Sequence, residues 1–393
     1  MTRHDPDSTT IQLALELLNS HGFEDLSGAL QLLFNEAMKI ERSDYLGAGP
    51  YERTEDRRGH ANGFKPKNLK TRIGTLELAI PQVRERDEGG DRFYPAALER
   101  GLRSERALTA ALAEMYIQGV STRRVRKITE ELCGTEISSS QVSRATKLLD
   151  DEIGQWRSRS LDPCPYIVLD ARYEKVRIGG IVVSAAVFVA MGVREDGRRT
   201  ILGISVGTSE AEVHWREFLE SLQLRGLRGV RLITSDSHSG LKAAINATFP
   251  GTAWQRCQFH LQRNAMHHFS KLSLRGEVAN CIRRIFAATD QVEANGLIND
   301  AITTYESSEP KLAAWMAENL LESLAVLQIP AAHRKRLRTS NAVERLNREI
   351  KRRTKVASIF PNTESLLRLV TTLAIEVSED WETGRIYLTM EPR

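Results

Sequence analysis

The sequence contains few cysteines, and none of them are closely paired. Its 393 residues include four cysteines at positions 133, 164, 257 and 281, with no CxxC pair. This scatter argues against a disulfide framework and is typical of a protein from a reducing compartment. Cys257 and His260 form CxxH, which has half of the spacing of a zinc site. No second pair with ligand spacing accompanies it, so we do not expect structural zinc.

Long hydrophobic runs are also missing. The first ten residues, MTRHDPDSTT, are polar and lack the apolar segment of a secretory signal. The longest apolar run, GGIVVSAAVFVAMGV, is shorter than the roughly 20 residues that span a bilayer. Because this run is rich in β-branched residues, it predicts a buried strand. We therefore expect a cytoplasmic protein that does not interact with membranes.

Charge is present in both signs, but it is unevenly distributed. The composition of 41% hydrophobic and 27% charged residues is ordinary for a soluble protein of two or three domains, and the net charge is only +4. Residues 334–355, however, hold ten Lys or Arg against two Glu, and residues 57–86 hold eight against two. Cationic clusters of this kind favour a nucleic-acid partner.

The first 160 residues predict mainly helical structure around a basic β segment. Apolar spacing predicts helices within 10–48 and 104–153, whereas KTRIGTLELAIPQVRERDEGGDRFYP predicts two short strands around Pro81, or an extended arm. Ser121 and the serines at 138–140 are N-cap candidates, and Gly119 and Gly134 lie where helices should end. The pattern fits a DNA-binding helix-turn-helix and a structural three-helix bundle equally well. In the first case the DNA-contacting candidates are Arg123, Arg124, Arg126, Lys127, Gln141 and Arg144.

From residue 165 onward the pattern changes to strands. Three successive strands are followed by helix, strand, helix and a short strand, and residues 265–333 then read as helices alone. This order predicts a ribonuclease H-like α/β catalytic domain with an all-α insertion, preceded by mainly α-helical DNA-binding domains. The predicted segments are 1–50 (helical), 51–103 (basic arm), 104–160 (helix-turn-helix), 161–262 (first part of the core), 263–333 (insertion) and 334–393 (C-terminal part of the core).

Two aspartates follow predicted strands of this core. Asp170 ends the run YIVLD and Asp236 ends VRLITSD, and ligand sites of open α/β sheets gather at such strand ends. Carboxylate oxygens are the ligands that Mg²⁺ and Mn²⁺ prefer, and two such ions can support phosphoryl transfer. Taken singly, each aspartate is more simply explained as a turn or cap residue.

A third carboxylate lies on the cationic segment. In a helix that begins after Ser340 or Asn341, an apolar stripe forms at Val343, Leu346 and Ile350, whereas Glu344, Arg348 and Lys351 share a neighbouring face. Glu344 would then face the two aspartates, with cations beside it for a phosphate backbone. The alternative is a solvated helix with an ion pair between Glu344 and Arg348.

Four sequence blocks carry a family resemblance. VLDARYEKVR, SDSHSGLKAA, WQRCQFHLQRN and RTSNAVERLNREIKRRTKVASIFPN, in this order, resemble the signature blocks of the IS256, or Mutator-like, family of bacterial DDE transposases. The resemblance extends from about residue 50, and it implies a ribonuclease H-like fold with a helical insertion. It also implies a catalytic, metal-binding triad of Asp170, Asp236 and Glu344 that uses Mg²⁺, for which Mn²⁺ can substitute.

The resemblance further implies cleavage at terminal inverted repeats followed by strand transfer into target DNA. Its consequences include double-stranded DNA as partner, a homodimer that pairs two DNA ends, and a nucleoid-associated location. His260 would be an active-site neighbour, although a structural histidine explains it equally well. The remaining DNA-binding candidates on the cationic segment are Arg345, Arg348, Lys351, Arg352 and Arg353.

Two rival functions share these features. A ribonuclease H-like nuclease without strand transfer has the same carboxylates, but it does not need the long N-terminal region. A domesticated, non-catalytic DNA-binding protein would keep the recognition domains, and loss of a triad carboxylate would favour it. All three carboxylates are present.

Overall fold

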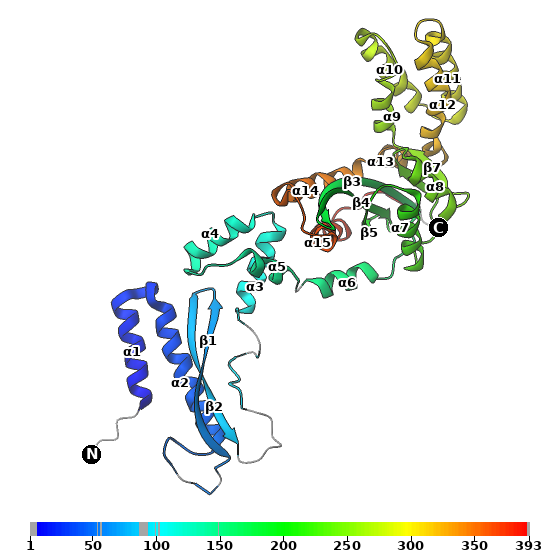
Figure 1. Cartoon of the computed structure of the whole chain (residues 1–393). Helices are drawn as coiled ribbons and strands as arrows, with labels where there is room; N and C mark the ends of the chain where they lie inside the picture. The colour runs from blue at the N-terminus through cyan, green and yellow to red at the C-terminus, as the bar shows by residue number, and fades with distance from the viewer. Residues whose placement is uncertain are drawn as a thin grey trace. The chain divides into compact units, whose positions relative to one another are not determined.

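The computed structural model describes residues 6–52, 54–55, 57–85, 93–98, 100, 103–147 and 149–390. The chain divides into two compact units, Met1–Leu148 and Leu149–Arg393 (Figure 1). No helix among the described residues is long and apolar enough to cross a membrane.

The first unit begins with two helices that pack beside a β-hairpin. Its elements before residue 100 are α1 (Pro6–His21), the 3₁₀ turn η1 (Gly22–Asp25), α2 (Leu26–Leu46), β1 (Gly59–Thr71) and β2 (Gly74–Glu85). Met38 of α2 packs against Leu76, Leu78 and Ile80 of β2. These β2 positions alternate with exposed or partly buried ones, as expected for a strand with one covered face.

The hairpin is longer than the sequence predicts. GHANGFKPKN, which the pattern indicates is irregular, forms most of β1 and pairs antiparallel with β2. The run lacks β-branched residues, so strand propensity gives no signal, and the ladder to β2 holds it instead. Pro81 lies opposite Phe64, beside the irregularity between Ala61 and Phe64, a location that tolerates a missing N–H.

Three further helices complete the first unit: α3 (Arg106–Ile117), α4 (Thr122–Cys133) and α5 (Ser139–Lys147). Helix α4 starts where predicted, because the Ser121 side chain accepts a hydrogen bond from the Arg124 N–H, at 3.3 Å. It ends at Gly134, whose φ of 59° lies in the left-handed region. Val125 and Val142 are fully buried between these helices.

The second unit contains a five-stranded mixed sheet of order β5-β4-β3-β6-β7. Its strands are β3 (Tyr166–Ile178), β4 (Ile181–Val193), β5 (Arg199–Gly207), β6 (Leu232–Ser235) and β7 (Ala253–Arg256). The first three form the predicted antiparallel meander, whereas β6 pairs parallel with β3 and β7 pairs parallel with β6. The chain is therefore a mixed α/β protein.

Helices cover both faces of this sheet (Figure 1). One face packs through Leu169 and Phe188 against Trp215 of α7 (Glu212–Leu224) and Leu241 of α8 (Ser239–Thr248). On the other face, Ser378 of α15 (Thr363–Thr383) accepts a hydrogen bond from the Ile201 N–H at 2.9 Å. Helix α14 (Asn341–Ala357) contacts β3 on this second face, and α6 (Asp150–Ser158) is joined to α15 by an ion pair between Asp150 and Arg368.

Between β7 and α14 the described chain is helical, as predicted, and it has a hydrophobic core of its own. Ile282, Ile298 and Met316 are among the residues of that core. The elements are α9 (Gln258–Ala265), η2 (Leu272–Leu274), α10 (Arg275–Phe286), α11 (Gln291–Glu306), α12 (Pro310–Asn319), η3 (Leu320–Ser323), η4 (Ala325–Gln328) and α13 (Ala331–Leu337).

Candidate functional site

The register of the sheet brings the two aspartates to neighbouring strands. Val168 of β3 pairs with Thr234 of β6, so Asp170 and Asp236 each lie two residues beyond the last residue pair. The prediction that Asp170 ends its strand is wrong, because β3 continues to Ile178 in its antiparallel ladder with β4. Asp170 instead lies just beyond the part of β3 that pairs with β6, because β6 is only four residues long.

The protonation of Asp170 is perturbed by its surroundings. Burial and, to a smaller extent, the charge of Asp236 raise the pKa of Asp170 to about 7, although His260 and the Ala171 N–H oppose the shift. Glu210, which follows β5 and has a side chain only 12% exposed, also raises the pKa of Asp170. The sequence analysis missed Glu210, because its neighbours give no strand-end or helix-face signal.

Helix α14 reaches Asp170 through an asparagine. The Asn347 Nδ2 donates to the Asp170 Oδ2 at 2.6 Å, and the Asn347 carbonyl accepts a hydrogen bond from Arg172. The Asn347 Oδ1 is buried without a partner among the described residues. Asn347 therefore holds the Asp170 carboxylate in place, a role that sequence reasoning also missed, although Asn347 lies one turn after Glu344.

Glu344 lies in the first turn of α14 and is partly exposed. Val343, Leu346 and Ile350 form the predicted buried stripe of this helix. The alternative ion pair between Glu344 and Arg348 is not formed in the described part of the chain. Nowhere in that part do three or more His, Cys, Asp or Glu side chains lie close enough to bind one metal ion. Glu344 as third ligand thus stays a prediction.

His260 lies beside the aspartate pair. Interaction with the Cys257 thiol raises the pKa of His260, and the charges of Asp170 and Asp236 add to this effect, although burial opposes it. The buried Cys257 Sγ accepts hydrogen bonds from Ser340, from its N–H at 3.3 Å and its hydroxyl at 3.4 Å. The CxxH motif therefore connects the start of α14 to the carboxylates.

The cations of α14 divide into two groups. Arg345, Arg348 and Lys351 are exposed and form no ion pair with a described residue. Arg352 and Arg353 instead bond to Glu349 at 2.7 Å, and the Arg353 side chain is only 5% exposed. The structure therefore does not favour a direct DNA contact by Arg353.

A second set of cations lies at the start of α14. A pocket of about 440 Å³ is lined by Arg199, Lys335, Arg336 and the first residues of the helix. Arg199 lies over the rings of Trp381 and Tyr387, and Arg336 also lies over Tyr387. Positive charge thus continues from the exposed face of α14 to its N-terminal end.

In the first unit the predicted DNA-contacting side chains lie on α4 and α5. Arg123, Arg124 and Arg144 are exposed, whereas Arg126 pairs with Glu136, and Lys127 lies 3.6 Å from Glu131. Gln141 accepts from the Ser138 N–H at 2.9 Å, and Ser138 accepts from the Gln141 N–H at 3.3 Å. In this capping box the Gln141 side-chain oxygen caps the N-terminus of α5.

Comparison with known proteins shows the family of this chain. Residues 5–384 match the family described as "Transposase, Mutator family". The chain is 52% identical to the transposase for insertion sequence element IS406 of Burkholderia multivorans, over 98% of this chain and 99% of that protein. It is 42% identical to the transposase for ISRM5 of Rhizobium meliloti, over 94% and 91% of the two chains. It is also 37% identical to the transposase for IS256 in transposon Tn4001 of Staphylococcus aureus, over 90% of each. The chain therefore belongs to the Mutator family of transposases, among the relatives of IS256.

Proposed function

We propose that this protein binds the terminal inverted repeats of its insertion sequence, cuts the DNA strands there and transfers the ends to target DNA. The observation that carries the proposal is the side-by-side location of Asp170 and Asp236 on β3 and β6. Membership of a transposase family and the cationic α14 support the same function.

The aspartate pair fits a divalent cation. Asp170 and Asp236 are both partly buried, and the charge of Asp236 raises the pKa of Asp170. A cation bound between two such carboxylates removes their repulsion, and Mg²⁺ commonly binds through one or two carboxylates plus waters and substrate phosphates. Asp170 and Asp236 would hold it, with Glu344 as the third carboxylate. When bound, the ion would polarise the scissile phosphate and increase the acidity of the attacking hydroxyl.

The chain's own residues have distinct parts in this proposal. Asn347 orients Asp170 by its 2.6 Å hydrogen bond. His260, with its raised pKa, would donate a proton or hydrogen bond to the scissile phosphate. Arg345, Arg348 and Lys351 would bind the phosphate backbone, and the exposed cations of α4 and α5 would bind the repeat.

A ribonuclease H-like fold for the second unit belongs to the same proposal. The sheet order, three antiparallel strands followed by two parallel ones, supports it. The partner would be double-stranded DNA, and a homodimer would hold two ends together for strand transfer.

The test uses a labelled duplex that carries one inverted-repeat end, incubated with full-length protein and Mg²⁺ or Mn²⁺. Strand nicking and joining to a target plasmid are measured separately. We expect Asp236→Asn and Glu344→Gln each to abolish both reactions while keeping gel-shift affinity for the repeat. Glu220→Gln, at an exposed carboxylate on α7, is the matched control.

The outcomes separate the candidate functions. Nicking without joining would favour the nuclease, and binding without nicking by wild-type protein would favour the non-catalytic alternative. Full cleavage by the Asp236→Asn protein would refute the assignment of the aspartate pair.

A further inference from the structure

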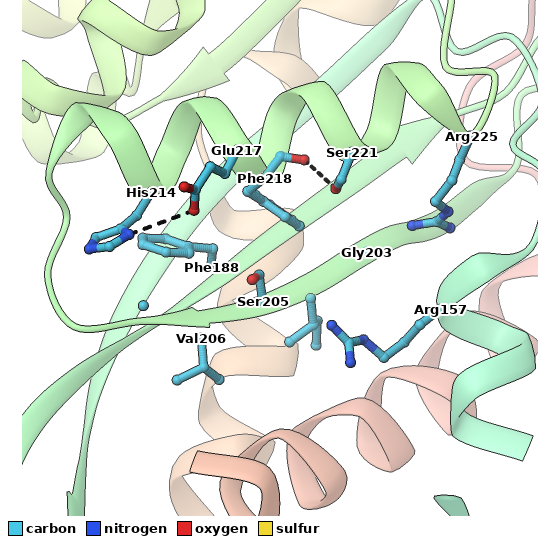
Figure 2. Close-up of a pocket in the computed structure, with 12 residues that line it drawn as sticks. Arg157, Phe188, Gly203, Ser205, Val206, His214, Glu217, Phe218, Ser221 and Arg225 are labelled. Atoms are coloured by element: carbon cyan, nitrogen blue, oxygen red, sulfur yellow. Dashed lines mark hydrogen bonds and ion pairs between the residues drawn. The ribbon is translucent and has the colours of Figure 1, made fainter. Parts of the chain in front are cut away.

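A pocket of about 240 Å³ lies between the edge strand β5, α7 and α6 (Figure 2). Ser205 in its wall pairs with Phe188, and Phe188 pairs with Ala171, whereas Asp170 pairs with Val189. Neighbouring residues of a strand point to opposite faces, so the Ser205 and Asp170 side chains lie on opposite faces of the sheet. The pocket is therefore separate from the aspartate site.

Two arginines enter this pocket at one end. Figure 2 shows Arg225 at the end of α7, near Gly203 of β5, and Arg157 on α6, across the β5 ribbon from Arg225. The Arg225 Nε donates to the Arg159 carbonyl at 2.9 Å, which fixes the guanidinium. Its Nη2 is buried and has no partner among the described residues. A buried donor without an acceptor is costly, and because Nη2 has almost no exposed surface, an anion in the pocket would contact the guanidinium through Nη1, which lies beside Gly203.

No carboxylate in the described part of the pocket wall neutralises these arginines. Burial and the charges of Arg159 and Arg157 lower the pKa of Arg225 to about 10. Arg159 itself is occupied, donating to the Trp156 carbonyl at 2.7 Å and to the carbonyl of Ile201. Glu217 lines the opposite end, where its carboxylate lies 3.9 Å from the His214 ring (Figure 2).

The strand leaves space for an occupant beside the guanidinium. A Cβ at position 203 would lie 3.0 Å from Leu222 and 3.3 Å from the Arg225 Nη1, so Gly203 keeps this corner of the pocket open. The Ser205 hydroxyl also lines the wall and supplies a neutral donor, whereas the Ser221 hydroxyl already donates to the Phe218 carbonyl at 2.6 Å. Two guanidinium groups and the Ser205 hydroxyl match a tetrahedral oxyanion, because each guanidinium presents a fork of N–H donors.

We infer that Arg157, Arg225 and Ser205 form a binding site for a phosphate group, on the face of the sheet opposite the aspartates. The phosphate could belong to a DNA backbone or to a free phosphate ion, because both present the same oxygens. Phosphate binding there needs no divalent cation, so its readout does not depend on the proposed cleavage reaction.

The experiment titrates full-length protein with inorganic phosphate by calorimetry in EDTA, and measures the salt dependence of duplex binding by fluorescence anisotropy. The variants are Arg157→Gln, at an exposed position, and Arg225→Lys, which keeps the charge but not the fork. Arg216→Gln, also on α7 but paired with Glu212, is the control. Circular dichroism verifies that each variant folds.

For a free phosphate site we expect saturable binding by wild-type protein that is at least tenfold weaker in Arg157→Gln and unaffected by saturating duplex. For a DNA site we expect duplex to displace phosphate, and Arg157→Gln to flatten the slope of log K against log salt by about one. If neither phosphate affinity nor the salt slope of Arg157→Gln and Arg225→Lys differs from that of Arg216→Gln, the site does not exist.

Discussion

Replacing Asp170 by asparagine should stabilise the metal-free protein, although it should abolish the proposed cleavage. The wild-type carboxylate is partly buried near Asp236, so its charged form costs free energy in the folded state. Asparagine has the same shape, carries no charge and still accepts the hydrogen bond from Asn347. The substitution therefore removes repulsion without removing the contact that holds residue 170.

The magnitude follows from the pKa. Folding raises the pKa of Asp170 from its ordinary value of 3.8 to about 7. Each unit corresponds to 1.36 kcal/mol, which gives an upper limit of about 4 kcal/mol. Because the folded pKa is raised, this cost is absent below pH 4, grows between pH 4 and 7, and is fully present above pH 7. Half of this upper limit, about 2 kcal/mol, would raise the Tm of a unit the size of Leu149–Arg393 by roughly 4–8 °C.

The assay is thermal unfolding of wild-type, Asp170→Asn and control Asp300→Asn proteins in EDTA from pH 4 to 8. Asp300 is exposed on α11. We expect Asp170→Asn to gain Tm at pH 8 and to match wild type near pH 4. Added Mg²⁺ should raise the Tm of wild type and leave that of the variant unchanged, because binding to the folded state alone is stabilising. A lower Tm for Asp170→Asn at pH 8 would refute the reasoning.

Three other predictions concern charge elsewhere. Glu349→Gln should lower stability at pH 7 by about 1–3 kcal/mol, because it removes the nearer of the two carboxylates that pair with the buried Arg353. Hydrogen bonds from Arg352 and then Arg353 lower the pKa of Glu349 to about 2. The difference in urea midpoint between wild type and Glu349→Gln should therefore persist above pH 4.5 and disappear as the pH falls toward 2. A difference that stays constant with pH would contradict this. Replacing both Arg348 and Lys351 by alanine should flatten the slope of log K against log salt for DNA binding by about 2, and it should slow strand transfer most at low salt. If the double variant transferred strands at the wild-type rate across a salt series, this face of α14 would be solvated without binding DNA. A fragment of residues 1–148, the first compact unit, should bind inverted-repeat duplex more tightly than random duplex in gel shifts, and equal affinities would argue against repeat recognition by this unit.

Features that depend on periodicity could be predicted from the sequence. The buried stripe of α14, the start of α4 at Ser121 and the meander from β3 to β5 all follow from local patterns of apolar, capping and turn residues. Arg353 continues the α14 stripe at the next helical position after Ile350, so its burial was signalled by spacing, but its charge suggested a surface location.

Features that depend on pairing between distant segments could not be predicted. The hairpin strand β1 is held by β2, and its own Gly- and Lys-rich sequence gives no strand signal. Asn347 contacts Asp170 across 177 residues of sequence, and an amide on a cationic helix resembles any solvated polar residue. Glu210 and the arginines of the β5 pocket become neighbours of their sites only through the tertiary fold.

The chain leaves the sheet after β7 and returns to nearly the same point. The Gln258 N–H donates to the Arg338 carbonyl at 3.0 Å, the Thr234 hydroxyl donates to the Leu337 carbonyl at 2.7 Å, and Cys257 bonds to Ser340. These bonds hold together the two ends of the helical segment between β7 and α14. The length of that segment therefore does not set the location of Glu344. The α10–α12 segment can therefore change in length or be replaced without moving α14, which carries Glu344, relative to the sheet.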